Sequence, residues 1–150
     1  MGNSNFEDII QFAIQREEDA CRAYGEMSKV SETPGLKELL LELQAEEKKH
    51  KELLQGITSK DIGNLEAHKV IDLKISDFLT EEPPAPDMNF QDLLIFAAKK
   101  EQQAVELYTS MKAAVNSAEL KKMFDFFIEQ EKEHKLKLET EYEKHVLEDG

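Results

Sequence analysis

Two copies of a Glu-x-x-His motif lie 84 residues apart in this chain, Glu47 with His50 and Glu131 with His134. A carboxylate and an imidazole three residues apart on an α-helix project from the same face. Each copy can therefore offer two ligands to one metal centre. The pair of motifs predicts a metal site with two related halves.

The same offset aligns many other positions, so the motif belongs to an internal repeat. Residues 5–54 and 89–138 are identical at 16 of 50 positions without a gap, where chance would give about 3. The chain is therefore interpreted as a duplicated helical hairpin. The matched pairs include Asn5/Asn89, Asp8/Asp92, Glu17/Glu101, Ala20/Ala104, Tyr24/Tyr108, Met27/Met111 and Leu36/Leu120.

Two helices are predicted in the first half, at 5–30 and 33–55. Asn5 is a good N-cap for the first helix, and Pro34 suits the first position of the second. Gly56 stands where the second helix should end.

The second half repeats this pattern. A third helix is predicted at 89–111, and a fourth begins after Ser117 and continues through Leu138 before a charged tail. The long connection at 57–88 has room for a short helix at 71–79.

These helices predict one all-α domain over residues 1–150. A helix of about 24 residues is about 36 Å long, and a connection of about 30 residues can cross that distance. The hairpins, 5–56 and 89–146, can then form an antiparallel four-helix bundle, with a long crossover at 57–88 between the second and third helices. We expect a pseudo-two-fold relation between the halves.

Each predicted helix has an apolar stripe that contains a glutamate where the core should be. Four buried carboxylates without cations would be prohibitively costly at neutral pH, whereas two divalent cations balance their charge. Four carboxylates and two imidazoles suit iron or manganese better than a thiolate-preferring metal. The predicted ligands are Glu17, Glu47, His50, Glu101, Glu131 and His134.

Other acidic residues are weaker candidates. Glu18 and Glu46 align with glutamines in the other half, and Glu129 and Glu133 lie off the apolar stripes. A solvated ion pair is the ordinary interpretation of one isolated Glu-x-x-His in a chain that is 34% charged. Two copies in register, with glutamates in the partner helices, favour a metal site.

Three more residues lie near the predicted ligands. Tyr24 and Tyr108 each follow a stripe glutamate by seven residues. Each is either a core aromatic or a hydroxyl that hydrogen-bonds a metal-bound carboxylate and orients it. Cys21 is interpreted as an inert helix cysteine that could lie near the site.

The net charge and the cysteine content indicate which cellular compartment and which classes of partner to expect. The net charge of -13 argues against nucleic acid and anionic membranes, and no segment approaches the ~20 apolar residues of a membrane span. The single cysteine permits no intrachain disulfide, and the N-terminal residues lack signal-peptide features, so a cytoplasmic protein is expected. Phosphate-loop, Cys-x-x-Cys and Ser-His-Asp patterns are absent, which argues against nucleotide binding, iron–sulfur redox and triad hydrolysis.

Taken together, these motifs resemble the ferritin-like di-iron carboxylate proteins, and among them rubrerythrin and its relatives. The resemblance covers nearly the whole chain. It implies two bound irons, each capped by one histidine and bridged by two glutamates, with one further glutamate as a terminal ligand of each iron. The implied bridging ligands are Glu47 and Glu131, the terminal ligands are Glu17 and Glu101, and the capping ligands are His50 and His134.

Two departures from rubrerythrin are visible. Rubrerythrin has an additional glutamate three residues after the ligand of the third helix, where this chain has Ala104, which puts a redox-linked ligand exchange in doubt. Rubrerythrin also has a rubredoxin-like site held by four cysteines. Since this chain has one cysteine, its electrons must come from a separate redox protein.

The resemblance implies a di-iron oxidoreductase that reduces hydrogen peroxide to water. One alternative is a ferroxidase that oxidises ferrous iron with dioxygen for iron handling. Another is a non-catalytic helical module that holds metal only for structure and binds a partner. Manganese or mixed iron and manganese loading suits the same ligands, and the resemblance also implies a homodimer.

Overall fold

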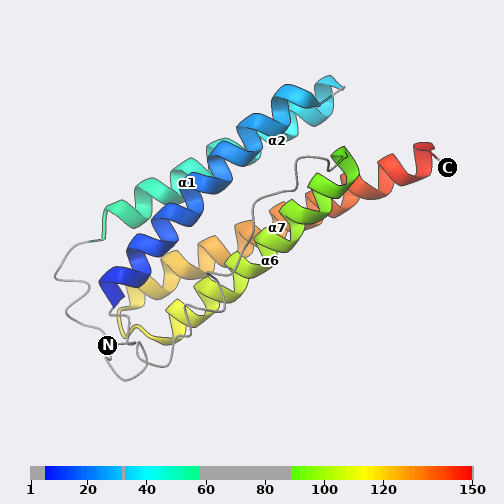
Figure 1. The fold of residues 1–150 in the computed structure, drawn as a ribbon. Helices are drawn as coiled ribbons and strands as arrows, with labels where there is room; N and C mark the ends of the chain where they lie inside the picture. The colour runs from blue at the N-terminus through cyan, green and yellow to red at the C-terminus, as the bar shows by residue number, and fades with distance from the viewer. Residues whose placement is uncertain (1–5, 32, 58–88, 150) are drawn as a thin grey trace. The chain divides into compact units, whose positions relative to one another are not determined.

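The computed structural model describes residues 6–31, 33–57 and 89–149 (Figure 1). Within these ranges the chain forms four α-helices, and it divides into two compact units at residues 72 and 73. Each unit contains one helical hairpin, and the two hairpins are described separately below. The helices are α1 (Phe6–Val30), α2 (Pro34–Gln55), α6 (Phe90–Ala113) and α7 (Ala118–Asp149).

In the first hairpin, α1 and α2 pack side by side and run in opposite directions (Figure 1). Thr33 caps α2, because its Oγ1 accepts a hydrogen bond of 3.3 Å from the backbone N–H of Leu36. Pro34 takes the first helical position as predicted. Gly56 ends the helix as predicted, but in the right-handed conformation, with φ -81°. Its N–H donates to the carbonyl of Glu52 over 3.1 Å.

In the second hairpin, α6 and α7 pack in the same antiparallel way (Figure 1). The Oδ1 of Asn89 accepts from the backbone N–H of Asp92 over 2.8 Å, which confirms the predicted cap. The Oγ of Ser117 accepts from the N–H of Leu120 over 3.2 Å. Ser117 thus caps α7 as Thr33 caps α2, at the equivalent position of the repeat.

The helix α7 continues further than the stripe alone indicated. The charged tail after Leu138 is helical to Asp149. It contains strong helix formers and no Gly or Pro before Gly150, and Lys144 forms an ion pair of 3.3 Å with Glu141, one turn earlier.

Each hairpin has one buried apolar stripe. The buried apolar residues of the first hairpin include Ile9, Ile10, Ala13, Tyr24, Met27, Leu36, Leu40, Leu43 and Leu54. Those of the second include Leu94, Ala97, Ala104, Tyr108, Met111, Leu120, Phe124, Phe127 and Leu138. The side chains of the six predicted ligands are buried within these stripes, as the spacing predicted.

Some predictions fall outside the described residues. The cap at Asn5, the connection at 58–88 and the short helix at 71–79 are among them. The single-domain boundaries and the pseudo-two-fold relation therefore stay predictions. No helix in the described ranges combines the length and apolar character that crossing a membrane requires.

Candidate metal centre

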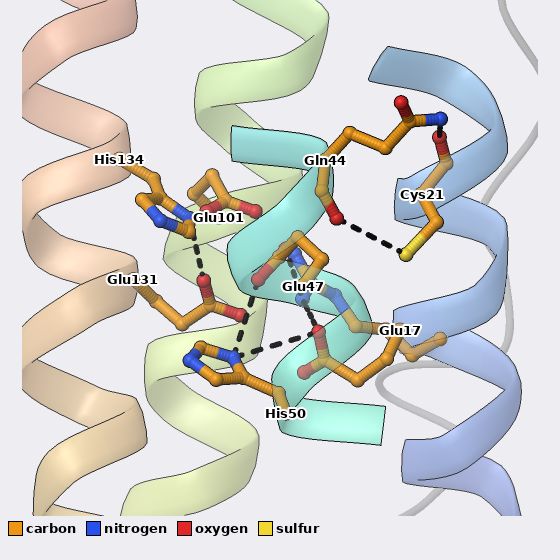
Figure 2. Close-up of polar contacts among 9 residues, drawn as sticks. Glu17, Cys21, Gln44, Glu47, His50, Glu101, Glu131 and His134 are labelled. Carbon is orange, nitrogen blue, oxygen red and sulfur yellow. Dashed lines mark hydrogen bonds and ion pairs between the residues drawn. The ribbon is translucent and has the colours of Figure 1, made fainter. Parts of the chain in front are cut away.

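The first half-site consists of Glu17 on α1 with Glu47 and His50 on α2 (Figure 2). All three side chains are completely buried. The Nδ1 of His50 lies 3.2 Å from Glu47 Oε1 and 3.6 Å from Glu17 Oε1. Each side chain offers one ligand atom, and these atoms lie within 4.8 Å of one another.

The second half-site consists of Glu101 on α6 with Glu131 and His134 on α7 (Figure 2). These side chains are also completely buried. The Nδ1 of His134 lies 2.8 Å from Glu101 Oε2 and 2.9 Å from Glu131 Oε1. The ligand atoms again lie within 4.8 Å of one another, so both halves of the repeat assemble the same donor set.

The protonation of His134 follows from this geometry. Burial by itself lowers the pKa of the imidazole, but the hydrogen bonds and negative charges of Glu101 and Glu131 outweigh burial and raise the pKa from 6.5 to about 10. A protonated ring neutralises part of the charge of the two carboxylates. Because a metal ion binds only a ring nitrogen that has lost its proton, metal entry at this half-site must release a proton.

The donor set of each half-site fits a divalent metal ion. Two carboxylates and one imidazole are oxygen and nitrogen ligands of the kind that iron and manganese accept. The Nδ1 atoms of His50 and His134 are the ring nitrogens that face the carboxylates, so Nδ1 is the atom that each ring would offer. Completely buried carboxylates also need positive charge nearby, which a metal ion supplies.

Arg16 also lies at the first half-site, although no motif in the sequence pointed to it. Its Nη1 is 2.8 Å from Glu47 Oε2 and 3.2 Å from Glu17 Oε1, and its side chain is 13% exposed. Neighbours in a helix do not face each other, so sequence spacing alone would not pair Arg16 with Glu17. The available signal was a basic residue before the ligand glutamate in both repeats, Arg16 and Lys100.

The two tyrosines are buried, as expected of core aromatics. The ring of Tyr108 packs against Phe127 and Phe124, with centroid separations of 5.0 Å and 6.2 Å. The proposed hydrogen bond from either tyrosine hydroxyl, of Tyr24 or of Tyr108, to a ligand carboxylate stays a prediction.

Cys21 lies one turn after Glu17 and is partly buried. Its Sγ lies 3.5 Å from the carbonyl oxygen of Gln44, and the Nε2 of Gln44 donates to the carbonyl of Cys21 over 2.8 Å (Figure 2). Burial and the negative charge of Glu17 raise the pKa of the thiol. These features agree with the prediction of an inert thiol.

The acidic residues that were set aside include two with side chains open to solvent. Glu18 is 43% exposed and pairs with Lys51, and Glu129 is 75% exposed and lies 3.9 Å from Lys132. Neither belongs to a half-site among the described residues, in agreement with the repeat for Glu18 and with the apolar stripe for Glu129.

Comparisons with known proteins identify the family and the fold of this chain. A family model described as Rubrerythrin matches residues 8–142. A solved structure from Thermotoga maritima, described as a ferritin-like diiron-carboxylate protein, has a TM-score of 0.72 and 24% identity, and the match covers 97% of this chain and 99% of that one. A hypothetical protein from Pyrococcus furiosus has a TM-score of 0.68 and 25% identity, with 91% and 87% coverage. No curated protein sequence matches the chain. The structural likeness confirms the predicted all-α, ferritin-like four-helix fold.

Proposed function

Because the chain belongs to the rubrerythrin family, we propose that its two half-sites join as one di-iron centre and that the protein is an oxidoreductase. One observation carries this proposal. Each hairpin buries two carboxylates and one imidazole whose ligand atoms lie within 4.8 Å of one another. Neither half-site alone supplies the two bridging carboxylates that the family resemblance implies. Joining the halves supplies both, Glu47 and Glu131.

The proposed reaction is the reduction of hydrogen peroxide to water. When bound, two ferrous ions would supply one electron each, which together with two protons converts one hydrogen peroxide molecule into two water molecules. In this proposal, a separate redox protein then returns the two electrons.

The residues of this chain hold and shield the centre. Burial of all six ligand side chains excludes bulk water from the carboxylates and so strengthens their attraction for cations. His50 follows Glu47 by three residues on α2, and its Nδ1 lies beside Glu47 Oε1. His134 follows Glu131 in the same way on α7.

Metal stoichiometry after anaerobic reconstitution with ferrous iron tests the proposal first. About two irons per chain are expected, as in two-metal carboxylate sites, and Glu47→Gln or Glu131→Gln should lower the content sharply. Glu129→Gln is the matched control, because it removes an exposed carboxylate from the same helix as Glu131. A chain that retains no iron or manganese would overturn the proposal and favour a partner-binding helical module.

Stopped-flow oxidation of the loaded protein then separates the two redox functions. Rapid oxidation by hydrogen peroxide and slow oxidation by dioxygen would support the peroxidase function. Oxidation by dioxygen of many added ferrous ions per chain would instead assign the protein to iron handling.

A further inference from the structure

The two half-sites differ in the basic residue that precedes the first ligand glutamate. In the first hairpin, the guanidinium of Arg16 contacts both ligand glutamates, Glu47 at 2.8 Å and Glu17 at 3.2 Å. At the equivalent position of the second hairpin, the ammonium of Lys100 lies over the ring of Phe96, 4.9 Å from its centroid. The two basic residues at this repeat position thus make different contacts in the two hairpins.

The atoms that Arg16 contacts are the atoms that a metal ion would use. Glu17 Oε1 lies 3.2 Å from the guanidinium and also faces His50 Nδ1, at 3.6 Å. Glu47 divides its oxygens, with Oε2 on Arg16 and Oε1 facing His50 at 3.2 Å. If Glu47 bridged two metal ions through both oxygens, Oε2 would have to be shared with the guanidinium or released by it.

Arg16 cannot remove this conflict by losing its proton. A guanidinium stays charged at every pH at which proteins are folded. It therefore balances buried carboxylate charge without metal, and it repels a divalent cation that approaches the same oxygens. Through Glu17 and Glu47, the guanidinium therefore stabilises the metal-free protein and destabilises the metal-bound protein.

We infer that Arg16 is a built-in counter-ion that competes with metal for Glu17 and Glu47, stabilising the metal-free protein and weakening metal binding at the first half-site. This inference rests on the proposed metal-binding function. It assigns to Arg16 the role of a cation that competes with metal, which neither the motifs nor the resemblance supplies.

Titration of the metal-free protein with Mn²⁺, followed by the electron paramagnetic resonance signal of the free ion, tests this inference. Mn²⁺ binds most weakly among the common divalent transition metals, which keeps dissociation constants in a measurable range. Arg16→Gln should tighten one binding step by about tenfold or more, a size typical of changes to groups that support metal ligands. The same substitution should lower the melting temperature of the metal-free protein.

The matched control is Lys100→Gln, which removes the same charge at the equivalent repeat position. It should leave both the Mn²⁺ affinities and the metal-free melting temperature close to those of the wild type. Arg16→Lys keeps the charge but loses the planar fork, and should tighten binding by a smaller factor. It also provides the test if Arg16→Gln does not fold without metal.

Replacing a competing arginine should tighten Mn²⁺ binding while lowering the melting temperature of the metal-free protein. This combination distinguishes competition from a merely structural role. A residue that only orients Glu47 would give weaker Mn²⁺ binding when replaced, and that result would overturn the inference. Unchanged Mn²⁺ affinities in the Arg16 variants would overturn it as well, while two bound ions in the wild type would leave the proposed function standing. Failure of every variant and of the wild type to bind Mn²⁺ or Fe²⁺ would overturn both.

Discussion

At the scale of single residues, the chemistry of the half-sites depends on how each buried charge is compensated. Glu17 and Glu47 meet the guanidinium of Arg16, whereas Glu101 and Glu131 meet the imidazole of His134. One of these cations is permanent and the other can be lost at high pH. The positive charge that His134 places beside Glu101 and Glu131 therefore depends on pH when no metal is bound.

The stability of the metal-free protein should depend on pH through His134. Its pKa is about 10 in the folded chain and 6.5 for the ordinary group, so protonation stabilises the folded state. This contribution is complete below pH 6.5 and is lost as the pH rises toward 10. Urea unfolding of wild type and His134→Gln should show a stability difference that shrinks across this window. A difference that grows with pH would contradict the assignment.

The thiol of Cys21 should react slowly near neutral pH. Burial and the charge of Glu17 raise its pKa, so less thiolate is present than in an ordinary cysteine. Alkylation by a neutral reagent should be slower in the folded chain than in the urea-denatured chain, and its rate should keep rising above the pH at which the denatured chain reaches a plateau. Since the chain has one cysteine, the denatured protein is its own control. Equal rates would show that the folded environment does not protect the thiol.

At the scale of elements, sequence patterns located the helices and most of the site. The apolar stripes placed all six predicted ligands on buried faces, and Thr33 and Ser117 were correctly predicted to lie at helix starts. Arg16 escaped these patterns because a long side chain can reach a ligand from a position that spacing assigns to another face. Gly56 was correctly predicted to end α2, although its right-handed conformation does not itself require a glycine.

The repeated caps provide a prediction for the helices themselves. Thr33→Ala removes the acceptor of the Leu36 N–H and should cost about 1 kcal/mol of unfolding free energy. Ser117→Ala should cost a similar amount, because its Oγ accepts from Leu120 in the same way. Chemical denaturation of both variants measures this. Thr33→Ser retains the acceptor and is the control, and a loss as large as that of Thr33→Ala would argue against the cap.

At the scale of the whole molecule, the two hairpins share the positions of their predicted ligands but differ in the core residues around them. The positions of Leu40 and Leu43 in the first hairpin are taken by Phe124 and Phe127 in the second, where the rings pack against Tyr108. The ligands are retained at the same positions while their surroundings differ. The sequence repeat predicted the shared ligands, whereas the aromatic packing depends on how three side chains from two helices meet in space.

A single di-metal centre and two independent metal sites should respond differently to the loss of Glu131. Glu131→Gln alters only the second hairpin, but a bridging Glu131 serves both metal ions. The substitution should therefore weaken both Mn²⁺ binding steps, and the rise in melting temperature on metal addition should shrink accordingly. For wild type, metal at 100 times its dissociation constant should add about 2.7 kcal/mol to the unfolding free energy. Loss of one step with the other unchanged would indicate two independent sites.

The contrast between Arg16 and Lys100 also bears on the ancestry of the chain. A centre built by two identical polypeptides must carry every substitution on both of its sides, because one gene encodes both. Joining two hairpins in one chain removes that constraint. An arginine that contacts the predicted ligands of one hairpin, with a lysine over an aromatic ring at the equivalent repeat position of the other, is a difference that two identical polypeptides could not have.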